Sequence, residues 1–361
     1  MDSFEWIRTG AMCAAIAGIL LNVVPIMLWV ERRGSALMQN RLGPNRVGPL
    51  GLFQAIADAL KFVFKEDPIP GHVEKFYYVL APLISLIPSF MTFAVIPFAA
   101  PIALDGRTVH FQVADLNVGF LYIFAIASLG VYGIIMGGWA SNNKYALLGS
   151  LRSSSQMISY ELSLGLSVIP MVMIYQTMSL GDIAAFQAQP LFFIGSVPIP
   201  SWGIFLFPVG PISFLILLTA VFAETNRLPF DLPEGESEIV AGYHVEYGAL
   251  KFALLMMAEY LNMTTASGLL TALYFGGYHF PGLHLFLNAI GLGDNVWALV
   301  ALQAGVFWGK VAFFMWFFVW VRWTLPRFRF DQVMDLGWKV MLPLCLVNIF
   351  VTGVLIYYKV F

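Results

Sequence analysis

Three carboxylates and one amine stand in strongly apolar stretches of the sequence, where an ionisable side chain is costly. They are Glu161, Glu224, Glu259 and Lys310. Ionisable groups in such surroundings mark functional sites by default. Because burial disfavours the charged form of a carboxyl group, such acids can take up and release protons reversibly near neutral pH. The three carboxylates predict a proton path; the alternative is that each is paired locally or reaches a polar boundary.

The segment Glu224–Glu238, ETNRLPFDLPEGESE, is the densest polar feature of the chain. Around one arginine, Arg227, it gathers five acids: Glu224, Asp231, Glu234, Glu236 and Glu238. Its prolines and glycine predict turns, not a continuous helix. Runs of acids are usually solvated loops, but this one lies flush against an apolar stretch that ends in an acid. We therefore expect an acidic funnel into the apolar region, with Glu246 eight residues further on.

A basic segment at 31–49, ERRGSALMQNRLGPNRVGP, follows the first apolar stretch, and an amphipathic helix is predicted after it over 50–65. Its apolar face comprises Phe53, Ile56, Ala57, Leu60 and Phe64, and its polar stripe Gln54, Asp58, Lys61 and Lys65. Such a helix can lie in the membrane interface with its apolar face against acyl chains. A plain surface anchor would explain the helix, but it explains less well why Asp58 sits among basic neighbours.

The elements that must position these residues are membrane-spanning helices. Of 361 residues, 59% are hydrophobic and 11% charged, against about 45–50% and about 25% in soluble domains. Since a helix crosses the hydrocarbon in about 20 residues, eight stretches qualify: 11–30, 77–103, 116–140, 154–177, 203–223, 249–275, 296–321 and 338–358. The prediction is an all-α integral membrane protein with about eight transmembrane helices plus the interfacial helix, forming a single polytopic domain over 1–361.

The distribution of basic residues sets the orientation. With eight spans, 15 of the 19 Lys and Arg residues flank one side and three the other, while Lys310 lies within a span. Basic residues concentrate on the cytoplasmic side of membrane proteins, so both termini are predicted outside the cytoplasm. The net charge of −2 gives no field that would recruit a nucleic acid.

Motifs for a bound redox cofactor are missing from the sequence. It contains no glycine-rich dinucleotide or triphosphate loop. Cys13 and Cys345 are the only cysteines and form no metal-ligand motif, and none of the five histidines lies well inside a predicted span. We therefore expect no haem, iron–sulfur cluster or other metal on this chain, and no residue is assigned a catalytic role with certainty. Electron chemistry must come from a partner.

Five segments together resemble one protein family. They are the basic segment at 31–49, ADALKFVFKED, GGWASNNKYALLGSLRSSSQMISYE, AETNRLPFDLPEGESEIVAGYHVEY and LPRFRFDQVMDLGWK. In this order they are similar to the quinone-pocket membrane subunit of proton-pumping NADH:quinone oxidoreductase, respiratory complex I. In bacteria this family is that of the H subunits, and its mitochondrial counterpart is subunit 1. The match runs from about Glu31 to Lys339.

The resemblance implies a role for each polar cluster. Residues that line or gate a quinone chamber would be Arg32, Arg41 and Asp58, and those of a loop that rearranges as quinone is reduced would be Arg227, Asp231, Glu234, Glu236 and Glu238. A buried acidic path would begin with Glu161, Glu224, Glu246 and Glu259. Counter-charges or docking residues would be Arg152, Arg322, Arg327 and Arg329, whereas Lys144 receives no role.

The resemblance also implies the surroundings. Quinone, either ubiquinone or menaquinone, would be the substrate without a covalently bound cofactor, in a bacterial inner membrane. Partners would be hydrophilic quinone-site subunits and membrane antiporter-like subunits. Two alternatives stay open: the equivalent subunit of a proton-translocating hydrogenase, and a stand-alone proton-coupled transporter using Glu161, Glu259 and Lys310.

Overall fold

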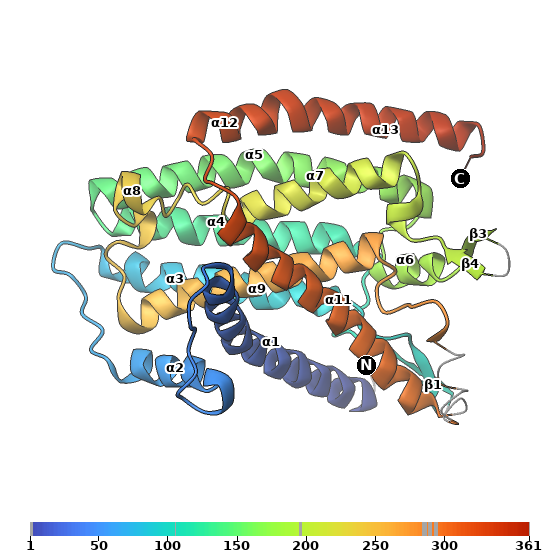
Figure 1. Cartoon of the computed structure of the whole chain (residues 1–361), viewed down its shortest axis with the longest axis horizontal. Helices are drawn as coiled ribbons and strands as arrows, with labels where there is room; N and C mark the ends of the chain where they lie inside the picture. Colours follow the sequence, from blue (N-terminus) through green and yellow to red (C-terminus); the bar gives the residue numbers. More distant parts are fainter. Residues whose placement is uncertain are drawn as a thin grey trace.

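The fold is a bundle of long helices with two short β-hairpins at one end (Figure 1). This computed structural model describes residues 3–104, 106–194, 197–283, 287, 291 and 295–360. Within them each predicted span matches one long helix: α1 (Ser3–Met38), α3 (Lys75–Met91), α4 (Gly119–Ala140), α5 (Lys144–Tyr175), α7 (Val209–Glu224), α9 (Ala249–Tyr274), α11 (Val296–Thr324) and α13 (Leu342–Tyr357).

By length and apolar composition, six helices of the described chain qualify as membrane-crossing: α1, α3, α4, α5, α11 and the run that ends in α13. The apolar helix α7 is shorter, and α9 is not among the six. The predicted all-α membrane fold is confirmed.

The long helices run broadly along one direction, with α11 crossing obliquely over α9 towards α1 (Figure 1). The α13 helix lies at one edge of the bundle against α5, and α1 and α2 (Gln54–Phe64) lie at the opposite edge. Large side chains such as Tyr160, Phe307 and Phe318 are fully buried between the helices. Both termini lie towards the end that carries the hairpins (Figure 1), as an even number of crossings requires.

Short elements gather at the two ends of the bundle. The end with the termini has α6 (Leu180–Gln187) and antiparallel hairpins of β1 (Ile102–Leu104) with β2 (Arg107–Val109) and β3 (Pro190–Ile194) with β4 (Val197–Pro200). The remaining short elements are η1 (Pro49–Gly51), η2 (Thr92–Val95), η3 (Gly203–Phe205), α8 (Glu236–Ile239), η4 (Gly242–His244), α12 (Phe330–Asp335) and the π-helical turn η5 (Leu336–Met341).

Several predicted boundaries differ from those of the helices. The span predicted over 77–103, for example, ends as α3 at Met91, and β1 begins within its last residues. The helix α5 begins at Lys144, ten residues before the predicted start of its span, because Asn143 caps it by accepting the Tyr145 N–H at 2.9 Å. Lys144 and Arg152 therefore belong to a helix and not to a loop. The interfacial helix begins at Gln54 instead of 50, because Leu50 has a φ of 56° and interrupts the helical backbone.

The eight predicted spans leave connections near 104–115 and 178–202 to which the sequence analysis assigns no element. The described residues there form the two hairpins and α6 instead. These elements are short, and their glycines and prolines read locally as turn signals, so the sequence pattern gave no periodic indication of them.

Candidate functional site

Five side chains from four parts of the chain meet in a buried ion cluster. It comprises Glu31 of α1, Arg227 of the loop after α7, Glu259 and Tyr260 of α9, and Arg322 of α11. Only 4% of the Arg227 residue surface and 8% of the Glu31 surface are exposed. A buried charge persists only when it is paired and hydrogen-bonded, so the members of this cluster depend on one another.

Arg227 stands at the centre of the cluster. Its Nη1 lies 3.3 and 3.4 Å from the two carboxylate oxygens of Glu31, and its Nε forms an ion pair with Glu259. The guanidinium also stacks 4.5 Å from the centre of the Tyr260 ring. Burial alone would lower the pKa of Arg227, but the charges of Glu259 and Glu31 raise it above its ordinary value. Arg227 is therefore a fixed positive charge shared by two acids.

Glu31 is a site residue that the sequence reasoning missed. Its carboxylate accepts a hydrogen bond from the Tyr260 hydroxyl at 2.6 Å and forms an ion pair with Arg322. The available signal was an acid at the polar end of an apolar stretch, directly before two arginines. Arg322, predicted as a counter-charge or a docking residue, forms an ion pair with Glu31.

A buried amide holds the Arg227 turn in place. The Gln156 Nε2 of α5 donates to the carbonyl oxygens of Ala223 and Phe230, both at 2.8 Å. These carbonyls lie on either side of Arg227 in the sequence, and Gln156 is fully buried. One side chain thereby clamps both ends of the turn onto α5, which fixes the direction in which Arg227 points.

Two of the predicted loop acids face the same region as the cluster. Asp231 accepts a hydrogen bond from Arg327 Nη2 at 3.0 Å, while Glu234 lines a cavity of about 170 Å³ together with Glu31, Arg227 and Glu259. Burial raises the pKa of Asp231 against the opposing charges of Arg327 and Arg322. Burial and the charges of Glu259 and Asp231 raise the pKa of Glu234. These acids are suited to exchanging protons with the cavity.

The remaining loop acids lie further out. Glu238 is exposed and accepts a hydrogen bond from Arg152 Nη1 at 2.7 Å. Glu236 belongs to α8, but its side chain lies outside the described residues. His244 Nδ1 is 3.9 Å from Glu234 Oε1, and burial lowers the pKa of His244 to about 4. The imidazole is therefore neutral at physiological pH.

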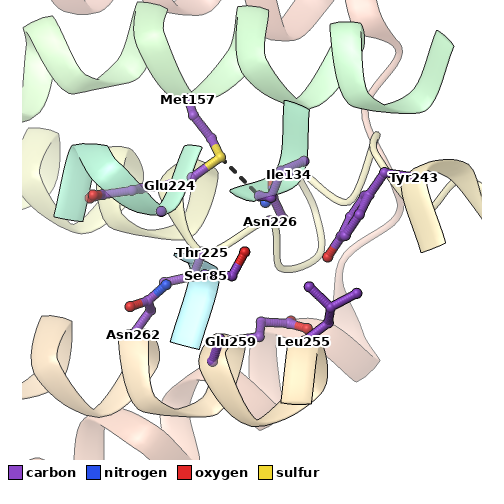
Figure 2. Close-up of a pocket in the computed structure, with 12 residues that line it drawn as sticks. Ser85, Ile134, Met157, Glu224, Thr225, Asn226, Tyr243, Leu255, Glu259 and Asn262 are labelled. Atoms are coloured by element: carbon purple, nitrogen blue, oxygen red, sulfur yellow. Dashed lines mark hydrogen bonds between the residues drawn. The ribbon is translucent and has the colours of Figure 1, made fainter. Parts of the chain in front are cut away.

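The predicted relay acids converge in part. Glu224 and Glu259 line one cavity of about 30 Å³ between α7 and α9 (Figure 2). Glu161 lies close enough to Glu224 for their charges to interact, and its carboxylate accepts a hydrogen bond from Ser128 of α4. The order Glu259, Glu224, Glu161 therefore leads from the buried ion cluster across the bundle.

Glu246 makes contacts of its own, apart from the ion cluster. Its Oε1 accepts a hydrogen bond from Asn143 Nδ2 at 2.7 Å, and its Oε2 lies 3.7 Å from His72 Nε2. The Tyr78 hydroxyl donates to its backbone carbonyl at 2.6 Å. These contacts fix the start of α5 against the loop before α9, and a relay role for Glu246 stays a prediction.

The interfacial helix is fastened to α1 by polar contacts. Arg32 forms an ion pair with Asp58, whose other oxygen accepts a hydrogen bond from Gln54 at 3.1 Å. The apolar face of α2 is exposed, with 51% of Ile56 and 53% of Leu60 accessible. The α2 helix thus presents a charged side chain to α1 and apolar side chains on its exposed face, as an interfacial helix does.

Arg41 and Lys310, both of which stood out in the sequence, lie apart from the ion cluster. Arg41 is exposed and donates to Gln39 Oε1 at 2.7 Å. Lys310 donates to the carbonyl oxygens of Phe275 at 2.6 Å, His279 at 2.7 Å and Gly277 at 3.0 Å, so it holds the chain where α9 ends. Glu259 lies fifteen residues earlier in α9. The transporter alternative requires Lys310 to lie beside the acids. In the described structure it does not.

The fold and the site define a class: a multi-pass membrane protein with a buried ion cluster that leads to intramembrane acids. Comparison with known proteins gives the family. A family model described as NADH dehydrogenase matches residues 11–353. The chain is 47% identical to the NADH-quinone oxidoreductase H subunit of Bdellovibrio bacteriovorus, over 99% of this chain and 98% of the relative.

Further H subunits of NADH-quinone oxidoreductase agree. In Cytophaga hutchinsonii the identity is 45% over 94% of each chain, and in Leptospira biflexa it is 47% over 95% of this chain and 93% of the relative. The chain belongs to the NADH dehydrogenase family that comprises these H subunits. The resemblance seen in the sequence is thereby confirmed.

Proposed function

We propose that this chain is a membrane subunit of a proton-translocating NADH:quinone oxidoreductase, in which it forms the membrane end of the quinone chamber and begins a buried acidic path. The observation that carries the proposal is the position of Arg227. It is shared by Glu31 and by Glu259, and Glu259 also lines the cavity that reaches Glu224. Membership of the family of H subunits supports this function over a role in a hydrogenase.

The chemistry follows from the charge of the site. Reduction of a quinone to a quinol consumes two electrons and two protons, and the electrons would arrive from a hydrophilic partner. A quinone head that passes the Arg32–Asp58 pair would approach the loop acids Asp231 and Glu234. Protons taken from this region change the charge around Arg227.

That change can be passed on by electrostatics. Since Arg227 is paired with Glu31 and Glu259, a changed charge on one side alters the proton affinity of the other. Glu259, Glu224 and Glu161 would then transmit it towards antiporter-like membrane subunits. The physical requirement is a network with two charge states, which a shared arginine between two acids provides.

The setting follows from the same assignment. The protein would lie in a bacterial inner membrane, with both termini outside the cytoplasm and the ion cluster towards the cytoplasmic side. The asymmetry of basic residues supports this orientation. The exposed apolar face of α2 would rest in the cytoplasmic leaflet, where a membrane quinone can enter.

A native gel of gently solubilised membranes tests the assignment. The gel is probed for this chain and stained for NADH oxidation. Co-migration with a very large NADH-oxidising band is the expected result. A large band that is active only with hydrogen would contradict it in favour of the hydrogenase, and a free species near 40.1 kDa would contradict membership of any complex.

A further inference from the structure

The segment that follows α2 is fastened to the start of α9 by an ion pair. The ammonium group of Lys251 in α9 pairs with Asp67, which lies three residues beyond the end of α2 at Phe64. Lys251 is only 8% exposed. The second carboxylate oxygen of Asp67 is buried and makes no hydrogen bond within the described protein. Since a buried charge depends on its partner, the position of Asp67 depends on Lys251.

The position of Lys251 is unfavourable for its own helix. It is the third residue of α9, and a positive charge in the first turn of a helix is repelled by the positive end of the helix dipole. The carboxylate of Asp67 offsets this repulsion across 184 residues of sequence. The lysine is therefore explained by this contact and not by the helix to which it belongs.

Lys251 lies over a buried pair of aromatic rings. Its Nζ is 5.7 Å from the centre of the Tyr78 ring of α3, and Tyr78 stacks on Tyr247 with ring centres 4.3 Å apart. The Tyr247 hydroxyl donates to the Tyr78 carbonyl oxygen at 3.1 Å, and both rings are buried. The ion pair thus holds the segment after α2 against the point where α3 and α9 meet.

The same contact restrains α2 itself, which lies beside the first turns of α9 (Figure 1). Phe62 of α2 packs against Phe252, the residue after the paired lysine, with ring centres 6.4 Å apart. Pro68 directly follows Asp67, and the residue before a proline is confined to extended backbone. The connection from Phe64 to Asp67 is therefore short and restricted, so the ion pair fixes the end of the helix.

We propose that Asp67 and Lys251 are positioning residues that fix α2 at the quinone entrance from the α9 side, as the Arg32–Asp58 pair does from the α1 side. The inference rests on the proposed entry of quinone at α2. Both residues act through the helix and do not react with the quinone. A long quinone tail still lies in the entrance when the head reaches the chamber, whereas a short tail has passed it. The pair therefore matters for long-tailed quinones.

Lys251→Met in the complex, reconstituted into vesicles, tests this role, because methionine keeps an apolar stem without the charge. Steady-state kinetics compare a quinone that has a long polyisoprenoid tail with one that has a single isoprenoid unit. We expect the KM for the long-tailed quinone to rise severalfold, while the KM for the short-tailed quinone and kcat for both stay close to wild type. A general loss of stability would instead lower kcat for both quinones alike. Lys251→Arg keeps the charge and should restore the KM.

Asp67→Asn breaks the same pair from the other side and is the milder change, so it also tests the proposal if the Lys251→Met complex does not assemble. It should raise the KM for the long-tailed quinone in the same way. Because residues of one ion pair are not independent, the double variant should raise this KM no further than Lys251→Met does.

Glu66→Gln is the matched control. Glu66 directly precedes Asp67 and is exposed, and no ion pair joins it to another described residue. This variant removes a neighbouring negative charge and should keep the wild-type KM for both quinones. All rates are normalised to the oxidation of NADH by a water-soluble electron acceptor, which measures the amount of assembled complex.

The outcomes separate this inference from the proposed function. A wild-type KM for the long-tailed quinone in Lys251→Met and Asp67→Asn would overturn the inference, and so would an equal rise for both quinones. If Asp58→Asn raised the KM in the same assay, the proposed entrance at α2 would stand without this ion pair. If Asp58→Asn left it unchanged as well, the proposed entrance would fail together with the inference.

Discussion

Removal of Arg227 is the substitution whose cost in stability follows most clearly from the contacts in the structure. Within the described residues, Arg227→Met deletes the one arginine that forms an ion pair with Glu259, whereas Glu31 keeps Arg322 and the Tyr260 hydroxyl. Breaking a buried ion pair by removing one partner costs about 3–5 kcal/mol, because it leaves an uncompensated charge. The charge left over is that of Glu259, so most of the loss should disappear when Glu259 is neutralised as well.

A double-mutant cycle measures this coupling. Residues in one ion-pair network show interaction energies of about 0.5–3 kcal/mol. The assay is the temperature at which the purified complex loses half its NADH:quinone activity in a fixed time. We expect this temperature to be highest for the wild type, lower for Arg227→Met combined with Glu259→Gln, and lowest for Arg227→Met alone.

The control cycle combines Arg227→Met with Glu161→Gln. The Glu161 carboxylate bonds to Ser128 and not to Arg227, so these two effects should add. If the Arg227→Met/Glu259→Gln protein is no more stable than the Arg227→Met protein, Glu259 does not depend on Arg227 for its charge compensation.

Three further predictions follow from single contacts. Asp58→Asn removes the charge that pairs with Arg32. Steady-state kinetics should show a KM for quinone raised severalfold, with a smaller change in kcat. A change in kcat alone would contradict a role of Asp58 at the quinone entrance. Burial lowers the pKa of His244 from 6.5 to about 4, so the contribution of its neutral imidazole to stability is present above pH 6.5 and is lost as the pH falls towards 4. His244→Gln should therefore make the thermal stability of the complex less dependent on pH across that window. A pH profile unchanged from that of the wild type would contradict this prediction. Lys310→Met leaves three carbonyl oxygens without their donor and should lower thermal stability while the KM for quinone stays constant, whereas a raised KM would show that Lys310 acts at the quinone site.

The sequence was sufficient for the helices and for the acids on them. Apolar length identified each span, and the cost of charge in hydrocarbon singled out Glu161, Glu224 and Glu259 by residue type and position alone. The length of an apolar stretch does not show where a helix begins outside the hydrocarbon. The start of α5 depends on the Asn143 cap and that of α2 on the backbone at Leu50, and both lie among polar residues.

The composition of the ion cluster could be predicted only in part. Arg227 and Glu259 stood out by residue type, but their pairing joins positions 32 residues apart on different segments. Glu31 contacts Arg227 across 196 residues of sequence, and no local pattern expresses such a contact. Gln156 is a further example, because a glutamine within a serine-rich helix shows its role only through the two carbonyls that it clamps.

If Glu224 couples quinone reduction to proton movement, its replacement must disturb both processes, and proton uptake by reconstituted complex measures this. Complex carrying Glu224→Gln is placed in vesicles and supplied with NADH and quinone. We expect turnover and proton uptake both to fall by about a hundredfold, as for loss of a proton-transfer group, while NADH oxidation by a water-soluble electron acceptor is unchanged. Full turnover together with full proton uptake would contradict the account.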